Sequence, residues 1–133
     1  MLYLLDTDTA SYAIRGASAT LDAALAASVP GSLAISAITR AELMYGLEKR
    51  GNPRALARLV QGFMGRVAMM PWDATAADRY AKLRAQLERG GTPIGQFDTM
   101  IAAHALALGA VLVSNNRKHF QQVKLLMLEN WHA

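Results

Sequence analysis

Short apolar segments alternate with longer helical segments along this chain, and this alternation limits the possible folds more than any other feature. A run of four to seven apolar residues between turn signals is typical of a buried strand. The expected strands cover residues 2–5, 32–36, 66–72, 110–114 and, as an edge strand, 123–128. Strands that alternate with helices form a parallel sheet covered on both faces. The sequence therefore predicts an α/β fold with a central, mostly parallel sheet.

Turn and cap residues mark the ends of the intervening helices. Glycines follow several of them, Pro53 is a favourable first helical residue, and Asp73 is expected to begin the longest helix. The expected helices cover residues 8–15, 19–28, 37–50, 53–64, 73–89, 95–108 and 116–121.

Composition limits the class of protein. A chain of 133 residues is expected to form a single domain, residues 1–133, and its longest apolar runs fall well below the roughly 18 residues of a membrane span. No secretory signal is visible, and the absence of cysteine excludes disulfides and thiol catalysis, so we expect a cytoplasmic protein. The net charge of +4 favours an acidic partner such as nucleic acid.

Polar side chains follow the expected strands. In a parallel sheet the ligand site lies beyond the carboxyl ends of the strands, where the strand order reverses. Asp98 adds a further carboxylate, because it opens the apolar face of the helix over residues 95–108. The polar residues that follow the strands are Asp6 and Asp8; Ser36, Thr39 and Glu42; and Ser114, Asn115 and Asn116.

Carboxylates gathered at one edge of a sheet repel one another, and unpaired burial costs several kcal/mol each. Mg²⁺ or Mn²⁺ would neutralise them with the oxygen ligands that these ions prefer. A zinc site is not expected, because His104, His119 and His132 show no ligand spacing, and each is expected to be packed or on the surface. Helix capping by Asp98 and simple exposure of Glu42 are the structural alternatives.

The segment DTDTA at residues 6–10 shares the two aspartates of one enzyme pattern. Phosphatases of the haloacid dehalogenase type carry Asp-x-Asp-x-Thr after an apolar strand, which would make Asp6 the nucleophile and Asp8 the general acid and base. Those enzymes also need a lysine and a late acidic pair. This chain has no aspartate after Asp98, and Glu129 is its only later acid.

A second resemblance covers nearly the whole chain. The segments YLLDTDTASYAIRG, ISAITRAELMYGLEK, TPIGQFDTMIAAHALALGAVLVSNN and LENW resemble, in order and spacing, the PIN-domain ribonucleases and specifically the VapC toxins of bacterial toxin–antitoxin modules. The resemblance implies a three-layer α/β/α sandwich and a ribonuclease that uses Mg²⁺ or Mn²⁺. It also implies cleavage by a metal-activated water, leaving a 5′-phosphate and a 3′-hydroxyl.

The resemblance also assigns roles to residues. Asp6, Glu42 and Asp98 match the three acids of the family, with Asp6 and Asp98 as direct metal ligands and Glu42 often acting through water. Asn116 stands where the family has its fourth acid, which puts a second metal in doubt. Asp8, at a position that usually holds Asn, is expected to cap the helix or to support the site, as are Thr7 and Ser114.

The expected partners are RNA and protein. Arg15, Arg40, Arg117 and Lys118 lie near the predicted carboxyl edge and are candidates for binding RNA phosphates, with plain solvation as the alternative. The resemblance implies a structured RNA such as tRNA, a homodimer, and a cognate VapB-like antitoxin that covers the acidic pocket. A binding module without catalysis, with its acids serving as caps, is the non-enzymatic hypothesis.

Overall fold

A computed structural model describes residues 1–132 and shows five strands in one sheet. Every neighbouring pair of strands is parallel, as predicted. The order across the sheet is β3-β2-β1-β4-β5, so β1 is central. The strands are β1 (Tyr3–Leu5), β2 (Leu33–Ser36), β3 (Ala68–Met70), β4 (Val111–Val113) and β5 (Leu128–Glu129).

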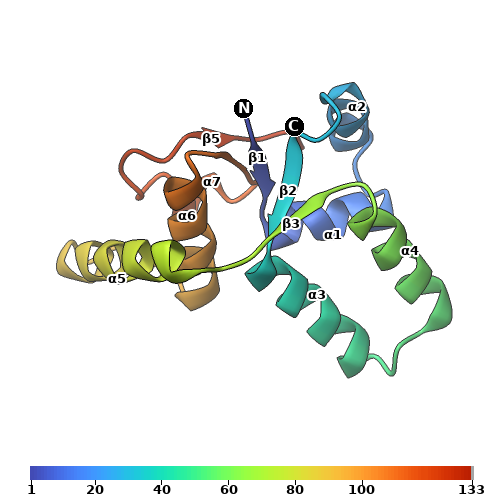
Figure 1. Cartoon of the computed structure of the whole chain (residues 1–133), viewed down its shortest axis with the longest axis horizontal. Helices are drawn as coiled ribbons and strands as arrows, with labels where there is room; N and C mark the ends of the chain where they lie inside the picture. The colour runs from blue at the N-terminus through green and yellow to red at the C-terminus, as the bar shows by residue number, and fades with distance from the viewer. Residues whose placement is uncertain (133) are drawn as a thin grey trace.

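Helices connect the strands and cover both faces of the sheet. Figure 1 shows α5 and α6 on one side of the sheet and α1, α3 and α4 on the other. This is the predicted three-layer α/β/α arrangement. The helices are α1 (Thr7–Arg15), α2 (Ala19–Ala27), α3 (Ala37–Lys49), α4 (Arg54–Met64), α5 (Ala74–Arg89), α6 (Gln96–Leu108) and the short α7 (Arg117–Phe120).

Two apolar clusters, one on each face of the sheet, form the core. Successive residues of a strand point to opposite faces, so Leu4 packs with the α5–α6 layer and Leu5 packs with the layer of α1 to α4. Leu112 and Val113 of β4 divide in the same way, and all four side chains are fully buried. Burial on both faces explains why the central strands are continuous apolar runs.

The helix boundaries agree with prediction to within one residue. Gly16 ends α1 in the left-handed conformation (φ 60°), which glycine adopts at little cost. Asp73 caps α5 by accepting a hydrogen bond from the backbone N–H of Ala76 at 3.1 Å. Pro53 is the residue before α4 rather than its first residue.

The edge strand predicted over residues 123–128 is wrong. Only Leu128 of that segment belongs to β5, and the residues before it form turns. Leu125 has a left-handed backbone (φ 68°) and is 86% exposed, so this apolar segment does not continue into the sheet. Within the described residues, no helix is long and apolar enough to cross a membrane.

The strand order places a switch point beside β1. The chain runs from β1 outward to β2 and β3, and it then returns to the other side of β1 to form β4 and β5. The carboxyl ends of β1 and β4 therefore lie together, joined by a hydrogen bond of 3.1 Å from the backbone N–H of Asp6 to the carbonyl of Val113. This edge is where a ligand site is expected in such a sheet.

Candidate active site

Asp6 lies at the carboxyl end of β1 and is 3% exposed. Its Oδ1 accepts a hydrogen bond from the backbone N–H of Thr9 at 2.9 Å, which makes Asp6 the N-cap of α1. Its Oδ2 accepts a hydrogen bond from the Ser114 hydroxyl at 2.6 Å. Burial raises the pKa of Asp6 above its ordinary value, although the hydrogen bonds from Ser114 and Thr9 oppose the shift. Asp6 therefore combines a fixed geometry with an unfavourable buried charge.

Glu42 reaches the same edge from the second turn of α3. Its Oε1 accepts a hydrogen bond of 2.6 Å from the Thr7 hydroxyl, and Thr7 Oγ1 lies 3.1 Å from Thr39 Oγ1. Since Thr7 has one hydroxyl hydrogen and gives it to Glu42, Thr39 must donate to Thr7. Burial raises the pKa of Glu42, with smaller contributions from repulsion by the neighbouring carboxylates of Asp98, Asp8 and Asp6. These acids therefore act on one another across the site.

Asp98 begins the buried face of α6 and contacts a histidine that the sequence analysis assigned to the surface. Asp98 Oδ2 lies 3.2 Å from Nδ1 of His119, which also lies 2.9 Å from the side-chain amide of Asn116. Nδ1 donates to the Asp98 carboxylate when it carries a hydrogen and accepts from Nδ2 of Asn116 when it does not, so the ring tautomer decides which of the two contacts is a hydrogen bond. Burial raises the pKa of Asp98, while the contact with His119 opposes the shift.

The three acids have the donor chemistry that a hard divalent cation requires. Within residues 1–132, the only ion pair of a Lys or Arg joins Arg84 to Glu88, far along the chain on α5, so no such cation neutralises the acids. The same residues contain no three His, Asp or Glu side chains already gathered to hold one ion. Carboxylate oxygens nevertheless suit Mg²⁺ or Mn²⁺, and burial, with a smaller contribution from neighbouring carboxylates, raises the pKa values of all three acids. The donor set thus fits such a cation.

The residues expected to support the acids, Thr7, Asp8 and Ser114, do not all have the expected contacts. Ser114 donates to Asp6, and its Oγ also accepts from the backbone N–H of Asn116 at 2.9 Å, so the structure brings Ser114 and Asn116 together with Asp6. Thr7 supports Glu42. The capping role suggested for Asp8 is wrong, because Asp6 is the cap of α1 and Asp8 is exposed in the first helical turn.

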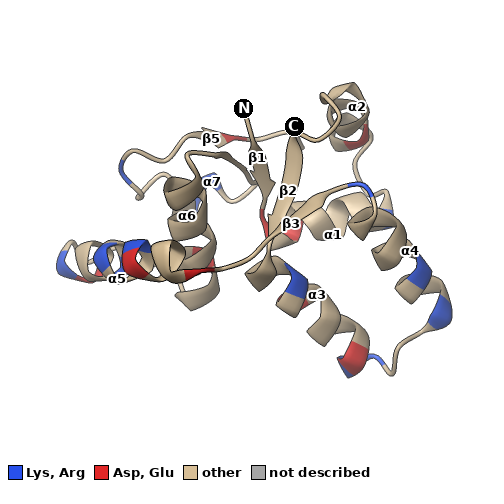
Figure 2. Ribbon diagram, viewed as in Figure 1, with Lys and Arg blue, Asp and Glu red and all other residues tan. Residues whose placement is uncertain are grey.

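The basic residues proposed for RNA binding are all exposed. Arg40 lies in the first turn of α3, and Arg117 and Lys118 begin α7 directly after Asn116. Arg15 ends α1 and lines a cavity with Asp8 and Asn116. Figure 2 shows basic residues spread over several helices, with acidic residues where β1 meets α1. The structure thus places the four residues near the acidic edge without gathering them into one patch.

Two histidines have structural roles. His104 is 1% exposed, and its Nδ1 lies 2.8 Å from Oγ of Ser36, which in turn caps α3. Burial lowers the pKa of His104, in agreement with the packed role expected for it. His132 Nε2 lies 3.0 Å from Oγ1 of Thr9, which ties the end of the described chain to α1.

Sequence reasoning missed two contributors, His119 and Thr39. The spacing of His119 was an available signal, because it lies three residues after Asn116 and so falls on the same face of a helix. Thr39 was noted only as a polar residue after the second strand, and its hydrogen bond to Thr7 joins two segments 32 residues apart. Local patterns do not reveal such a contact.

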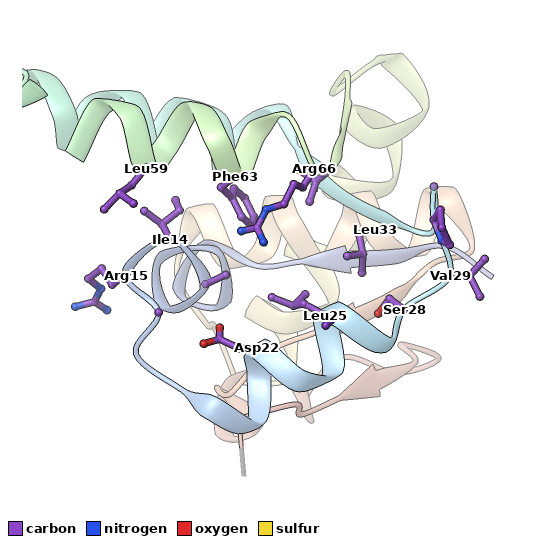
Figure 3. Close-up of a pocket in the computed structure, with 16 residues that line it drawn as sticks. Ile14, Arg15, Asp22, Leu25, Ser28, Val29, Leu33, Leu59, Phe63 and Arg66 are labelled. Carbon is purple, nitrogen blue, oxygen red and sulfur yellow. The ribbon is translucent and has the colours of Figure 1, made fainter. Parts of the chain in front are cut away.

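A larger cleft lies between α1, α2 and α4 and reaches the amino ends of β2 and β3. It has a volume of about 600 Å³, and its lining combines apolar side chains with Arg15, Asp22 and Arg66. Figure 3 shows Leu59 and Phe63 of α4 on one wall and Leu25 of α2 on the other, with Ile14 of α1 between them. Asp6, Glu42 and Asp98 do not line this cleft, so it is separate from the site of the acids.

Comparison with known proteins identifies the class of protein to which this chain belongs. The PIN-domain family model matches residues 3–126. The tRNA(fMet)-specific endonuclease VapC of Shigella flexneri is 36% identical over 129 residues, which are 97% of this chain and of that protein. Ribonuclease VapC2 of Rickettsia felis is 36% identical over 132 residues, 98% of each chain.

Solved structures agree with this result. The crystal structure of DNA-bound VapBC from Salmonella typhimurium matches with a TM-score of 0.92 and 36% identity, covering 98% of this chain and 99% of that chain. The structure of VapBC-1 from nontypeable Haemophilus influenzae matches with a TM-score of 0.89 and 31% identity over the full length of both chains. The chain belongs to the VapC family of PIN-domain ribonucleases, the toxins of VapBC toxin–antitoxin systems.

Family membership and geometry both disfavour the phosphatase alternative. Both carboxylate oxygens of Asp6 already accept hydrogen bonds, which suits a fixed ligand better than an attacking nucleophile. Asp8 lies two residues later, is exposed, and makes no hydrogen bond to Asp6 within residues 1–132. The pattern in DTDTA is therefore only a local coincidence.

Proposed function

We propose that this protein is an endoribonuclease toxin that depends on Mg²⁺ or Mn²⁺ and cleaves a structured RNA such as tRNA. The observation that supports the metal is the set of three partly or fully buried acids, Asp6, Glu42 and Asp98, whose pKa values are raised and which no Lys or Arg of the described residues neutralises. The names of the VapC relatives support RNA, and in one case tRNA, as the substrate class.

The residues of the chain would hold the ion and order the substrate. Asp6 and Asp98 would ligate the cation, with Glu42 beside them and Asn116 offering an amide oxygen. A bound divalent ion lowers the pKa of its water and neutralises charge that develops on the phosphate. Ser114, Thr9 and Thr7 fix the carboxylate oxygens of Asp6 and Glu42, so little reorganisation is needed. Arg117 and Lys118 are exposed next to Asn116, where they would attract the RNA backbone.

Cleavage of RNA by the purified protein tests this proposal. Total RNA incubated with Mg²⁺ or Mn²⁺ should be cut at few positions, and EDTA should stop the reaction. Asp6→Ala and Asp98→Ala should each remove cleavage, while Asp78→Asn, a change at an exposed aspartate of α5, should not. Sequencing of the RNA ends identifies the substrate. Cleavage that survives both active-site changes would contradict the assignment of these acids.

We also propose a VapB-like antitoxin as the protein partner. The matching solved structures from Salmonella typhimurium, Rickettsia felis and Haemophilus influenzae are VapBC structures. The cleft between α1, α2 and α4 is suited to the side chains of a protein segment, and Leu59 on its rim is 53% exposed. Co-purification of this chain with the antitoxin, and loss of ribonuclease activity on binding, tests the proposal.

A homodimer is the assembly we propose for the toxin. Exposed apolar side chains lie on α3 and β3, at Tyr45 and Met69, which are 64% and 44% exposed. Such side chains are candidates for burial between two copies. The chain has a mass of 14.4 kDa, and light scattering should give twice that mass. A monomer at micromolar concentration would contradict the proposed homodimer.

A further inference from the structure

A small polar alcove lies beside the acidic site, between α1 and the segment that follows β4. Its volume is about 370 Å³, and its lining consists of Asp8, Tyr12, Arg15, Asn115 and Asn116. The alcove adjoins the acids, because the backbone N–H of Asn116 donates to Ser114, which in turn donates to Asp6. Whatever occupies the alcove is therefore a neighbour of a group at Asp6.

The walls of the alcove are held in place by contacts behind them. The guanidinium carbon of Arg15 lies 5.2 Å from the ring centroid of Tyr12, a cation–π arrangement, and the ring of His132 packs edge-on against Tyr12 at 4.9 Å. Asn115 Oδ1 accepts a hydrogen bond of 3.1 Å from Nδ2 of Asn130. A site ordered before its ligand arrives loses less conformational entropy on binding.

The chemistry of the walls suits a planar ligand with both donors and acceptors. Asn115 and Asn116 each carry two N–H donors and an acceptor oxygen, so Asn115 still has donors to offer although its oxygen is used. The guanidinium plane of Arg15, which lies over the Tyr12 ring, provides a stacking surface of the kind that unpaired bases use in RNA recognition. The Asp8 carboxylate repels a phosphate group but accepts hydrogen bonds, which favours an amino-bearing edge.

We propose that this alcove binds one unpaired nucleobase of the RNA next to the scissile phosphate, and that Asp8 selects a base with an exocyclic amino group over uracil. This inference rests on the proposed ribonuclease function. It gives Asp8 a role that its exposed position at the start of α1 otherwise leaves without explanation. The guanidinium of Arg15, held over Tyr12, supplies stacking, and the amides of Asn115 and Asn116 supply the remaining hydrogen bonds.

Nucleotide binding to the metal-free protein tests the proposal without any cleavage. CMP and UMP are a matched pair, because cytosine presents an amino donor where uracil presents a carbonyl acceptor. Each is titrated into the full chain in EDTA, and binding is followed by NMR signals of the Asn115 and Asn116 side-chain amides. We expect CMP to bind about tenfold more tightly than UMP. Ribose 5-phosphate, which lacks a base, should bind more weakly than either.

Two variants sharpen the result. Asp8→Asn should abolish the preference for CMP, because an amide can donate to the uracil carbonyl, whereas Asp78→Asn on α5 should retain it. Tyr12→Leu should weaken binding of both nucleotides about tenfold, because the Arg15 guanidinium loses the ring that holds it for stacking. The backbone amide spectrum of each variant verifies its fold.

Several outcomes would contradict the proposal that the alcove binds a nucleobase. They are equal binding of CMP and UMP, a preference that survives Asp8→Asn, ribose 5-phosphate binding as tightly as CMP, and no binding of CMP at all. Because the titration needs neither metal nor hydrolysis, its failure is distinct from failure of the ribonuclease function. If the protein cleaves RNA but binds CMP and UMP equally, only the nucleobase proposal is rejected. If it prefers CMP but cleaves no RNA, only the ribonuclease assignment is rejected.

Discussion

Replacing Asp6 with Asn should stabilise the metal-free protein at neutral pH. Asp6 is almost fully buried, and its pKa is raised even though Thr9 and Ser114 donate hydrogen bonds to it. The folded protein therefore disfavours the ionised form relative to a neutral side chain of the same shape. Asn keeps the cap on the Thr9 N–H through its oxygen, and its NH₂ group can donate to Ser114 Oγ.

The size of the effect depends on the cost of burying the Asp6 charge and on the hydrogen bonds that Asn would make in its place. A shift of one pKa unit corresponds to about 1.4 kcal/mol, and weakening one neutral hydrogen bond costs about 1 kcal/mol. Because the raised pKa already includes the hydrogen bonds of the charged form, burial outweighs them, and we expect a net gain in stability at pH 7.5. For a chain of this size each 1 kcal/mol of gain raises the melting temperature by about 3 to 5 °C.

The gain should depend on pH in one direction. The folded pKa of Asp6 is raised, so the stability that its protonation contributes is fully present below the ordinary pKa of aspartate and is lost as the pH rises through the folded value. Wild type and Asp6→Asn should therefore converge near pH 4 and separate toward pH 7.5. Groups that do not interact with Asp6, such as His104, are common to both proteins and cancel in the difference, whereas Glu42 loses its repulsion from Asp6 and adds to the gain of Asp6→Asn.

Thermal unfolding in EDTA between pH 4 and 8 measures this difference. Asp78→Asn serves as the control, because a change at an exposed aspartate is expected to shift stability by less than about 0.5 kcal/mol. If Asp6→Asn is less stable than wild type at pH 7.5, and the difference does not vary with pH, Asp6 is a favourable buried cap and the argument for unbalanced charge fails.

Four further predictions concern the metal, the site, the antitoxin and the core. Mn²⁺ at 100 times its dissociation constant should stabilise the wild type by about 2.7 kcal/mol, and Asp98→Asn should lose most of that gain in a melting assay. Thr7→Val should slow RNA cleavage about tenfold because it frees Glu42, and Thr7→Ser should restore the rate; equal rates for all three proteins would exclude this positioning role. Leu59→Glu, a change on the exposed rim of the cleft, should weaken antitoxin binding more than tenfold in calorimetry, and unchanged affinity would place the antitoxin elsewhere. The lowered pKa of His104 contributes stability above pH 6.5 that is lost as the pH falls, so His104→Phe should flatten the acid side of the stability profile while costing about 1 to 3 kcal/mol.

The sequence by itself determined the pattern of the fold and the principal acids. Helix and strand periods, with Gly16 and Asp73 as boundary signals, are local properties of the chain, so the helix limits followed to within one residue. Asp6 and Asp98 were visible because each stands where an apolar segment meets a charged residue, at a strand end or at the start of a buried helix face.

Only the tertiary structure decided which side chains support those acids. The apolar segment over residues 123–128 has the composition of a strand, yet only its end, from Met127, bonds to β4, because the left-handed backbone at Leu125 turns the preceding residues away from the sheet. DTDTA offers two similar carboxylates, and the structure separates them by burial. Asp6 lies beside the carboxyl end of β4, where the Ser114 hydroxyl donates to it. Asp8 is exposed to solvent and lines the alcove.

The contacts of His119 with Asp98 and of Thr39 with Thr7 join residues 21 and 32 positions apart. Such contacts depend on how parallel strands are ordered around β1, and a period along the chain carries no information about that order.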